Sequence, residues 1–165
     1  FMGEALAKRL SGFELEVIAY DKYKSNFTDQ YVKEVNMDYI FKNADFVSLH
    51  TPLSQETKNL VNSTFINAFN KSFFLINTAR GKSVVLEDLL KGLENEKIKG
   101  ACLDVLALES PSFERFPYID DSSFKSLSQC KNVIFTPHIA GWTHESKEKM
   151  ACVILDKIKK EFLPN

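Results

Sequence analysis

The sequence predicts an α/β fold built around a mostly parallel β-sheet. Short apolar runs that end at Asp, Asn or Pro alternate along the chain with segments whose apolar residues recur at helical spacing. This alternation is typical of parallel sheets that helices cover on both faces. With 165 residues and a 44% hydrophobic composition, the chain can form one domain with a sizeable core. We expect that domain to span residues 1–165.

Each expected strand is a short apolar run bounded by polar or turn-forming residues. The run 15–20 is closed by Asp21, and the run 46–50 is stopped by Pro52. In chain order, the expected strands cover residues 15–20, 46–50, 73–76, 98–105 and 133–135. Cys102, within the fourth of these strands, is expected to be a small residue buried in the core.

Each expected helix combines apolar residues on one side with a start or stop signal. In 86–96, four leucines beginning at Leu86 have the i, i+3, i+4, i+7 spacing of an amphipathic helix. Asn62-Ser63 provides a helix cap. In chain order, the expected helices cover residues 3–10, about 62–69, 86–96 and about 143–162. The Pro-, Ser- and Asp-containing stretch 110–132 is expected to be a long surface excursion rather than a domain linker.

The composition argues against several classes of protein. A net charge of −1 and a pI near 6.4 give no reason to expect nucleic-acid binding. No apolar run approaches the roughly 20 residues of a membrane span, and the opening residues lack the features of a signal peptide. The three widely spaced cysteines, an odd number, indicate free thiols in a reducing compartment. We therefore expect a cytoplasmic protein without a metal site.

The chain starts at Phe1-Met2-Gly3 and enters a helix-like segment directly, with no strand before it. A parallel sheet of this class places its first strand at the centre, ahead of the first helix. We therefore expect that the chain is a fragment or is incompletely represented, and that the first strand lies upstream.

A dinucleotide-binding signal lies near this start. Gly3 opens the first helix, and Asp21 stands 18 residues later, at the end of an apolar strand. In a Rossmann unit such a glycine lets the helix pack closely, and the acid accepts hydrogen bonds from ribose hydroxyls. Only the last glycine of the G-x-G-x-x-G pattern is present, so a plain helix start is the alternative. Asp21 favours NAD over NADP, although Lys22 and Lys24 could reach a 2′-phosphate.

Three residues that can perform chemistry stand just past apolar strands. Arg80 and Gly81 follow the third strand, Glu109 comes five residues after Asp104, and His138 lies in TPHIAG at 136–141. In an open α/β sheet the ligand site lies outside the carboxyl ends of the strands. We expect Arg80, Glu109 and His138 to form one cluster there.

These pieces together resemble the nucleotide-binding domain of D-isomer-specific 2-hydroxyacid dehydrogenases. The matching stretches are GEALAKRL, VIAYD, ADFVSLHTPLSQETKNLVN, LINTARGKSVVLEDLLKGL, IKGACLDV and TPHIAGWT, in the family's order. Within the family, AKRLSGFELEVIAYDKYK and PHIAGWTHES are most similar to D-3-phosphoglycerate dehydrogenases. The resemblance implies a Rossmann-type, doubly wound domain, with a separate substrate domain that is not present in this chain.

The resemblance also implies catalytic roles. Arg80 matches the arginine that holds the substrate carboxylate, which a planar guanidinium can bind through two hydrogen bonds. His138 matches the general acid/base, since imidazole titrates near neutral pH. Glu109 matches the carboxylate that orients the histidine and raises its pKa. The family commonly has Pro directly after this Glu, whereas this chain has Ser110.

The cofactor-binding positions are likewise implied by the resemblance. They are the residues that match family positions around the pyrophosphate, ribose and nicotinamide of NAD. These positions are Phe1, Met2, Gly3, Asp21, His50, Thr51, Pro52, Thr78, Ala79, Arg80, Asp104, His138, Ile139, Ala140 and Gly141. For His50 a role as a capping residue at a strand end is an equal alternative.

From the residues and the resemblance we expect an NAD-dependent oxidoreductase. It would transfer hydride between NAD and a D-2-hydroxy acid, with 3-phosphoglycerate of serine biosynthesis as the expected substrate. The expected partners are a small 2-hydroxy or 2-oxo acid and a second copy in a homodimer, but no nucleic acid or membrane. One alternative is a non-catalytic, NAD-binding corepressor or scaffold. Another is a different 2-hydroxyacid or formate dehydrogenase, and Glu109 argues against the formate enzyme.

Overall fold

The structure of the chain is a computed structural model that describes residues 2–107 and 121–163. Its strands form two parallel sheets, one of two strands and one of four, the latter in the order β3-β4-β5-β6. The strands are β1 (Ile18–Ala19), β2 (Lys33–Glu34), β3 (Phe46–Leu49), β4 (Phe73–Asn77), β5 (Ile98–Leu103) and β6 (Val133–Phe135). The α/β class with a parallel sheet is confirmed.

From β2 to β6, a helical segment lies between each strand and the next, as parallel crossovers commonly require, whereas β1 and β2 are joined without a helix. The helical segments are α1 (Met2–Leu10), α2 (Met37–Asn43), α3 (Ser63–Ala68), the 3₁₀ turn η1 (Gly81–Ser83), α4 (Leu86–Glu94), α5 (Ser122–Gln129) and α6 (His144–Phe162). Each of the four expected helices is present. The cap at Asn62 is also present, since its side chain accepts a hydrogen bond from the backbone N–H of Phe65.

Three elements were not expected from the sequence. Strand β2 is a Lys-Glu pair, and α2 follows it with a cap from Asn36. Helix α5 lies inside the stretch expected to be a surface excursion, and its cap is Asp121, which accepts from the N–H of Phe124. The expected strand 15–20 is reduced to the two residues of β1, which pair with the two residues of β2.

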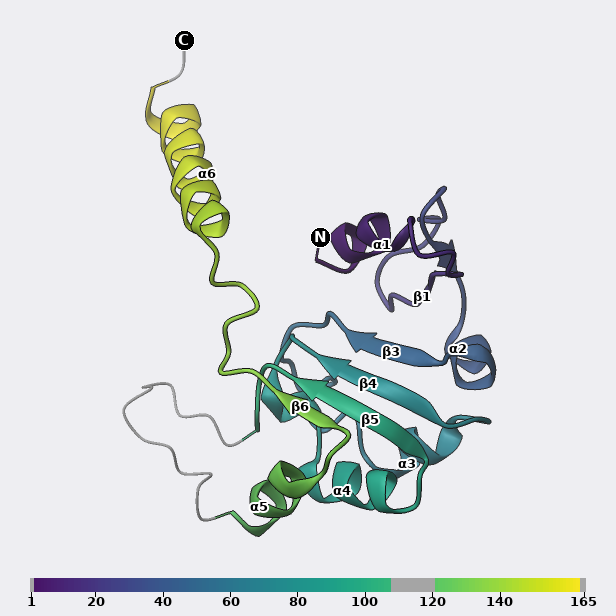
Figure 1. Cartoon of the computed structure of the whole chain (residues 1–165). Coiled ribbons are helices and arrows are strands. Elements are labelled where there is room, and N and C mark those ends of the chain that lie inside the picture. Colours follow the sequence, from purple (N-terminus) through teal and green to yellow (C-terminus); the bar gives the residue numbers. More distant parts are fainter. Residues whose placement is uncertain (1, 108–120, 164–165) are drawn as a thin grey trace.

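Helices α3, α4 and α5 cover one face of the four-stranded sheet (Figure 1). The core beneath them includes Leu75, Leu89, Ile98, Leu103 and Leu127, each almost completely buried. Burial of this apolar surface is the main favourable contribution to folding.

The opposite face of the four-stranded sheet is largely open among the described residues. Phe46 and Ile134 are 62% and 60% exposed, and Cys102, in register with Ile134, is exposed as well. The expectations that Cys102 belongs to the core and that helices cover both faces of these strands are therefore wrong. Side chains alternate between faces along a strand, so Ala101 and Leu103 point to the helices and Cys102 points away.

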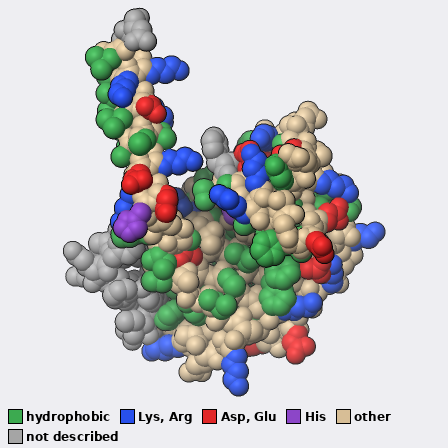
Figure 2. Space-filling model, turned by 45° about the horizontal axis from the view of Figure 1, so that its top comes forward, with side chains coloured by type: hydrophobic (Ala, Val, Ile, Leu, Met, Phe, Trp, Pro, Cys, Tyr) green, Lys and Arg blue, Asp and Glu red, His purple; other side chains and the backbone are tan. Residues whose placement is uncertain are grey.

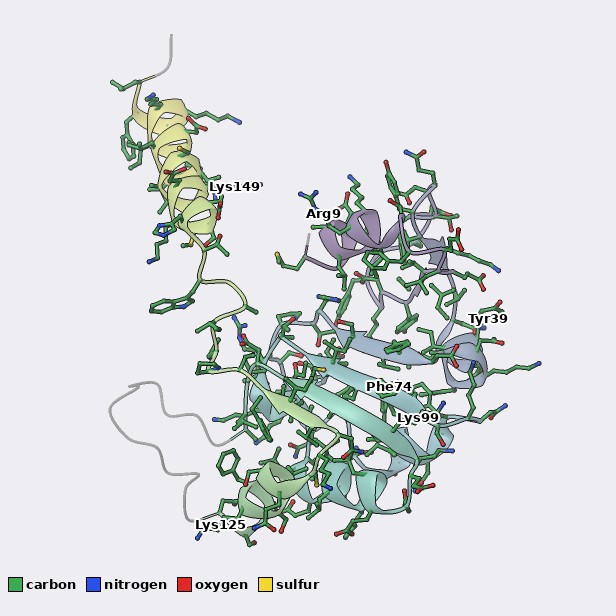
Figure 3. All side chains as sticks on the ribbon, in the orientation of Figure 1. Arg9, Tyr39, Phe74, Lys99, Lys125 and Lys149 are labelled. Carbon is green, nitrogen blue, oxygen red and sulfur yellow. The ribbon has the colours of Figure 1, made fainter. Side chains whose placement is uncertain are left out.

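Helix α6 stands apart from the sheet (Figure 1). Thr143 caps it in a reciprocal arrangement with Ser146, and none of its 19 residues is buried. Hydrophobic side chains lie along it in Figure 2, and Figure 3, in which Lys149 is labelled, shows its side chains projecting on all sides of the helix. Across the described residues, no helix is long and apolar enough to cross a membrane.

The core predicts the cost of one substitution. Leu89→Ala removes a fully buried side chain from α4, and the cavity should lower the free energy of unfolding by about 2–5 kcal/mol. Chemical denaturation of the purified protein measures this. The matched control is Leu155→Ala on α6, where the side chain is 53% exposed and the expected change is within about 0.5 kcal/mol. Equal losses for the two variants would contradict the described core.

Candidate functional site

The carboxyl ends of β3, β4, β5 and β6 lie at one edge of the sheet because all four strands run parallel. His50, Arg80, Asp104 and His138 follow these strands in that order. Hydrogen bonds continue the ladder past the strand ends, from Asp104 N to the Asn77 carbonyl at 3.0 Å and from Thr136 N to the Leu103 carbonyl at 3.0 Å. The loops that carry the expected site residues are therefore neighbours at this edge.

The Asp104 carboxylate anchors the loop after β6. One carboxylate oxygen accepts from the Thr136 hydroxyl and from the N–H of Ile139 at 2.9 Å, and the other accepts from the N–H of Ala140 at 2.9 Å. Burial raises the pKa of Asp104, but these hydrogen bonds and the nearby His138 outweigh burial and bring the pKa below its ordinary value. Asp104 is thus an anion that organises residues 136–140.

His138 is held in an uncommon backbone conformation. Its φ of 54° lies in the left-handed region, which a residue with a Cβ adopts at a cost of about 1–2 kcal/mol. Its N–H donates to the Asp104 carbonyl at 2.9 Å and to the Thr136 carbonyl at 3.0 Å. The backbone carbonyl of Asp104 therefore fixes the backbone position of His138. The Asp104 carboxylate fixes Thr136 before it and Ile139 and Ala140 after it.

Asn77 shapes the turn that carries Arg80. The Asn77 side chain is completely buried, accepts from the N–H of Ala79 at 3.0 Å and donates to the Arg80 carbonyl at 3.0 Å. Arg80 is exposed, and its guanidinium donates to the Ala79 carbonyl at 2.7 Å. Thr78 is exposed and Ala79 is partly buried in the same turn. Sequence reasoning missed Asn77, although an amide that ends an apolar strand is a signal for such a turn.

Gly81 allows two loops to touch. A Cβ on Gly81 would lie 2.0 Å from both the carbonyl carbon and the carbonyl oxygen of Leu106. No side chain fits at that distance, so glycine lets the turn after β4 lie against the segment that leaves β5. This segment leads toward Glu109.

The start of α1 meets the end of β3. A Cβ on Gly3 would lie 3.3 Å from Cδ2 of His50, so the imidazole packs on the glycine. The His50 ring is 3.0 Å from the Ser48 hydroxyl through Nε2, and burial lowers the pKa of His50, which keeps the ring neutral near pH 7. The buried hydroxyl of Thr51 has no hydrogen-bond partner within the described residues.

Asp21 lines an open cavity. The cavity has a volume of about 760 Å³ and is lined by residues that follow β1 and by residues around β2. One carboxylate oxygen of Asp21 accepts from the N–H groups of Tyr23 at 2.9 Å and Lys24 at 3.1 Å, which fixes the acid in a tight turn. An acid held in this way can accept hydrogen bonds from a sugar diol.

Residues 1–140 match the family described as D-isomer specific 2-hydroxyacid dehydrogenase, NAD binding domain. The chain belongs to this family. The expected NAD-binding Rossmann domain is therefore confirmed. The geometry fits NAD, since Asp21 at its cavity and the loops that carry Arg80 and His138 follow the carboxyl ends of strands, and Gly3 at the start of α1 packs against His50 after β3.

Several proteins are similar in sequence or in structure to this NAD-binding domain. The chain is 34% identical to a hydroxypyruvate reductase of Thermotoga maritima over 97% of this chain and 49% of that protein. It is 35% identical to a glyoxylate reductase of Thermococcus litoralis over 99% of this chain and 48% of that protein. The crystal structure of a D-isomer specific 2-hydroxyacid dehydrogenase from Lactobacillus delbrueckii ssp. bulgaricus, in its NAD-complexed form, matches with a TM-score of 0.83 and 33% identity. This match covers 96% of this chain and 49% of that one.

The NAD-binding domain spans about half the length of these relatives. Two expected site residues, Phe1 and Glu109, lie outside the described residues, so the expected contact of Glu109 with His138 stays a prediction. Met2 is exposed at the start of α1, and Pro52, Ile139, Ala140 and Gly141 are exposed around the site edge. Over residues 2–107 and 121–163, no group of three or more acidic, Cys or His side chains could hold a metal ion.

In the NAD-binding domain, Asp104→Asn should destabilise the protein most at neutral pH. The folded pKa of Asp104 lies below its ordinary value, so its stabilisation is complete above the unfolded pKa of about 3.9 and is lost as pH falls through the folded pKa. We expect a loss of about 1–3 kcal/mol at pH 7. Denaturant unfolding of both proteins between pH 7 and pH 3 measures it. A difference between them that does not shrink as the pH falls below about 4 would contradict the role of the carboxylate.

Gly81→Ala should destabilise the NAD-binding domain by about 1–3 kcal/mol, because the added methyl group meets the Leu106 carbonyl. Chemical denaturation at pH 7 measures the change. Gly12→Ala is the matched control, since a Cβ there meets nothing within 4 Å. If the two alanine variants unfold at the same denaturant concentration, the close approach of the two loops is not present in solution.

Proposed function

We propose that the protein containing this chain is an NAD-dependent D-2-hydroxyacid dehydrogenase that acts on small 2-hydroxy and 2-oxo acids. The observation that carries the proposal is the anchored His138. Its left-handed backbone is fixed by Asp104, at the same sheet edge at which Asn77 shapes the Arg80 turn. A domain that only bound nucleotide would need neither the titratable ring of His138 nor the guanidinium of Arg80 on backbone segments held in this way.

The cofactor would lie along the carboxyl edge of the strands. The start of α1 at Gly3 and the turn at Thr78 and Ala79 would face its phosphates and linking sugars, and Asp21 would accept the ribose hydroxyls. Ile139, Ala140 and Gly141, which Asp104 positions, would border the nicotinamide. When bound, NAD supplies the hydride acceptor or donor.

The protein's own side chains would handle the substrate and the proton. Arg80 would bind the substrate carboxylate through two parallel hydrogen bonds and so orient C2. An imidazole nitrogen of His138 would take the proton of the C2 hydroxyl when the substrate is oxidised. It would give a proton to the C2 carbonyl oxygen when the substrate is reduced. Glu109 would hold the ring of His138 and favour its protonated form.

The substrate class follows from the relatives. The similarity to a hydroxypyruvate reductase and to a glyoxylate reductase supports a substrate that is a 2-oxo acid about as small as hydroxypyruvate or glyoxylate. The second candidate is 3-phosphoglycerate, the substrate expected from the stretches AKRLSGFELEVIAYDKYK and PHIAGWTHES. Rates of NADH oxidation with glyoxylate and hydroxypyruvate, compared with the 3-phosphoglycerate reaction, distinguish the two.

We further propose that the intact enzyme is a cytoplasmic homodimer. Cys102, Cys130 and Cys152 are all free thiols, as a reducing compartment favours. The expectation of a dimer comes from the family resemblance, and the mass of the full-length protein in solution tests it. A non-catalytic corepressor remains the alternative, which measurable turnover would exclude.

His138→Ala in the full-length protein should lower kcat by about 10²–10⁴-fold, because general acid–base catalysis contributes that much. Steady-state rates with NAD and the best substrate measure it. His144→Ala is the matched control, since His144 is an exposed histidine at the start of α6. Turnover of the His138 variant at the wild-type rate between pH 6 and pH 9 would refute the assigned role.

A further inference from the structure

A carboxylate from the loop after β3 holds two consecutive residues of the loop after β1. Oε1 of Glu56 accepts from the Lys22 ammonium at 2.6 Å, and Oε2 accepts from the Tyr23 hydroxyl at 2.6 Å. These partners lie 34 and 33 residues before Glu56 in the chain. The contact therefore joins the two-stranded sheet to the four-stranded sheet.

Glu56 is displayed on a turn with a fixed shape. The Thr57 hydroxyl donates to the Pro52 carbonyl at 2.6 Å and accepts from the N–H of Ser54 at 2.8 Å. At the end of this turn, Asn59 N donates to the Lys82 carbonyl at 2.9 Å, which ties it to η1. The backbone that carries Glu56 is therefore held in place beside Lys22 and Tyr23.

The held residues line the cavity at Asp21. The Lys22 contact, more than the Tyr23 contact, lowers the pKa of Glu56, and Glu56 in turn raises the pKa of Lys22, so both are charged at neutral pH. Lys24, the other cation of this loop, has its ammonium 5.8 Å from the centre of the Phe27 ring. Both lysines that could meet a phosphate on the ribose already have another contact.

We propose that Glu56 is a specificity-determining residue that favours NAD over NADP by pairing with the Lys22 ammonium, which could otherwise pair with a ribose 2′-phosphate. The inference rests on the proposed dehydrogenase function. Asp21 repels a 2′-phosphate, and Lys22 is the adjacent cation that could offset this repulsion. With Glu56 in place, the charges of Asp21, Lys22 and Glu56 sum to −1, whereas without Glu56 they sum to zero.

Fluorescence titration of the full-length protein with NADH and with NADPH tests the proposal. Glu56→Gln should raise the affinity for NADPH relative to NADH by about two- to fivefold, the range for an exposed ion pair. The same substitution in a Lys22→Met background should leave the ratio unchanged, because the cation to be released is gone. Glu94→Gln, an equal charge change on an exposed residue of α4, is the matched control.

The outcomes separate this proposal from the dehydrogenase function. A Glu56→Gln ratio equal to that of the wild type and of Glu94→Gln overturns the role of Glu56 while NADH binding stands. An equal effect of Glu56→Gln with and without Lys22 also overturns it, since Lys22 would then not be the group that Glu56 controls. A wild-type protein that binds neither dinucleotide overturns both the specificity role and the proposed function.

Discussion

The site depends on one buried carboxylate more than on any other group. Asp104 directly follows β5 and is almost completely buried. Its backbone N–H, its backbone carbonyl and its two side-chain oxygens each form hydrogen bonds with a different part of the site edge. The N–H reaches β4, and the oxygens reach the loop after β6. A buried charge is tolerated only when hydrogen bonds satisfy it, so the loop must close on Asp104 in one way. That closure gives His138 its left-handed backbone.

The turn beside Asp104 that carries Arg80 is also held by residues that fix the backbone. Asn77 uses both ends of its amide on the turn that carries Arg80, and Gly81 removes the side chain that would separate this turn from the segment after β5. Neither residue has a reactive group. They fix backbone positions, while Arg80 and His138 provide the chemistry, and this division is common where a rigid sheet carries variable loops.

Much of this architecture could be predicted from the sequence because apolar strands and capped helices are local signals. Strand 133–135 and the cap at Asn62 are examples, and the family pattern led to Asp21, Arg80 and His138. Strand β2 could not be found, since Lys33 and Glu34 carry no apolar alternation and pair only because β1 lies beside them. The exposure of Cys102 was also beyond local sequence, because burial of a strand face depends on where distant helices pack. The contact of Glu56 with Lys22 spans 34 residues and has no local signature.

The arrangement of strands sets a gradient of amide protection across the domain. Strands β4 and β5 have hydrogen-bonded neighbours on both sides, whereas β6 pairs with β5 alone and the two-residue β2 pairs with β1 alone among the described residues. Amides of a strand that is paired and buried exchange with solvent only through large openings, and those of a short edge pair exchange through small ones. The region around Asp21 can thus open while the core under α4 stays closed. A ligand that binds at the Asp21 cavity would therefore first slow the amide hydrogen exchange of β1 and β2 and leave the exchange of β4 and β5 unchanged.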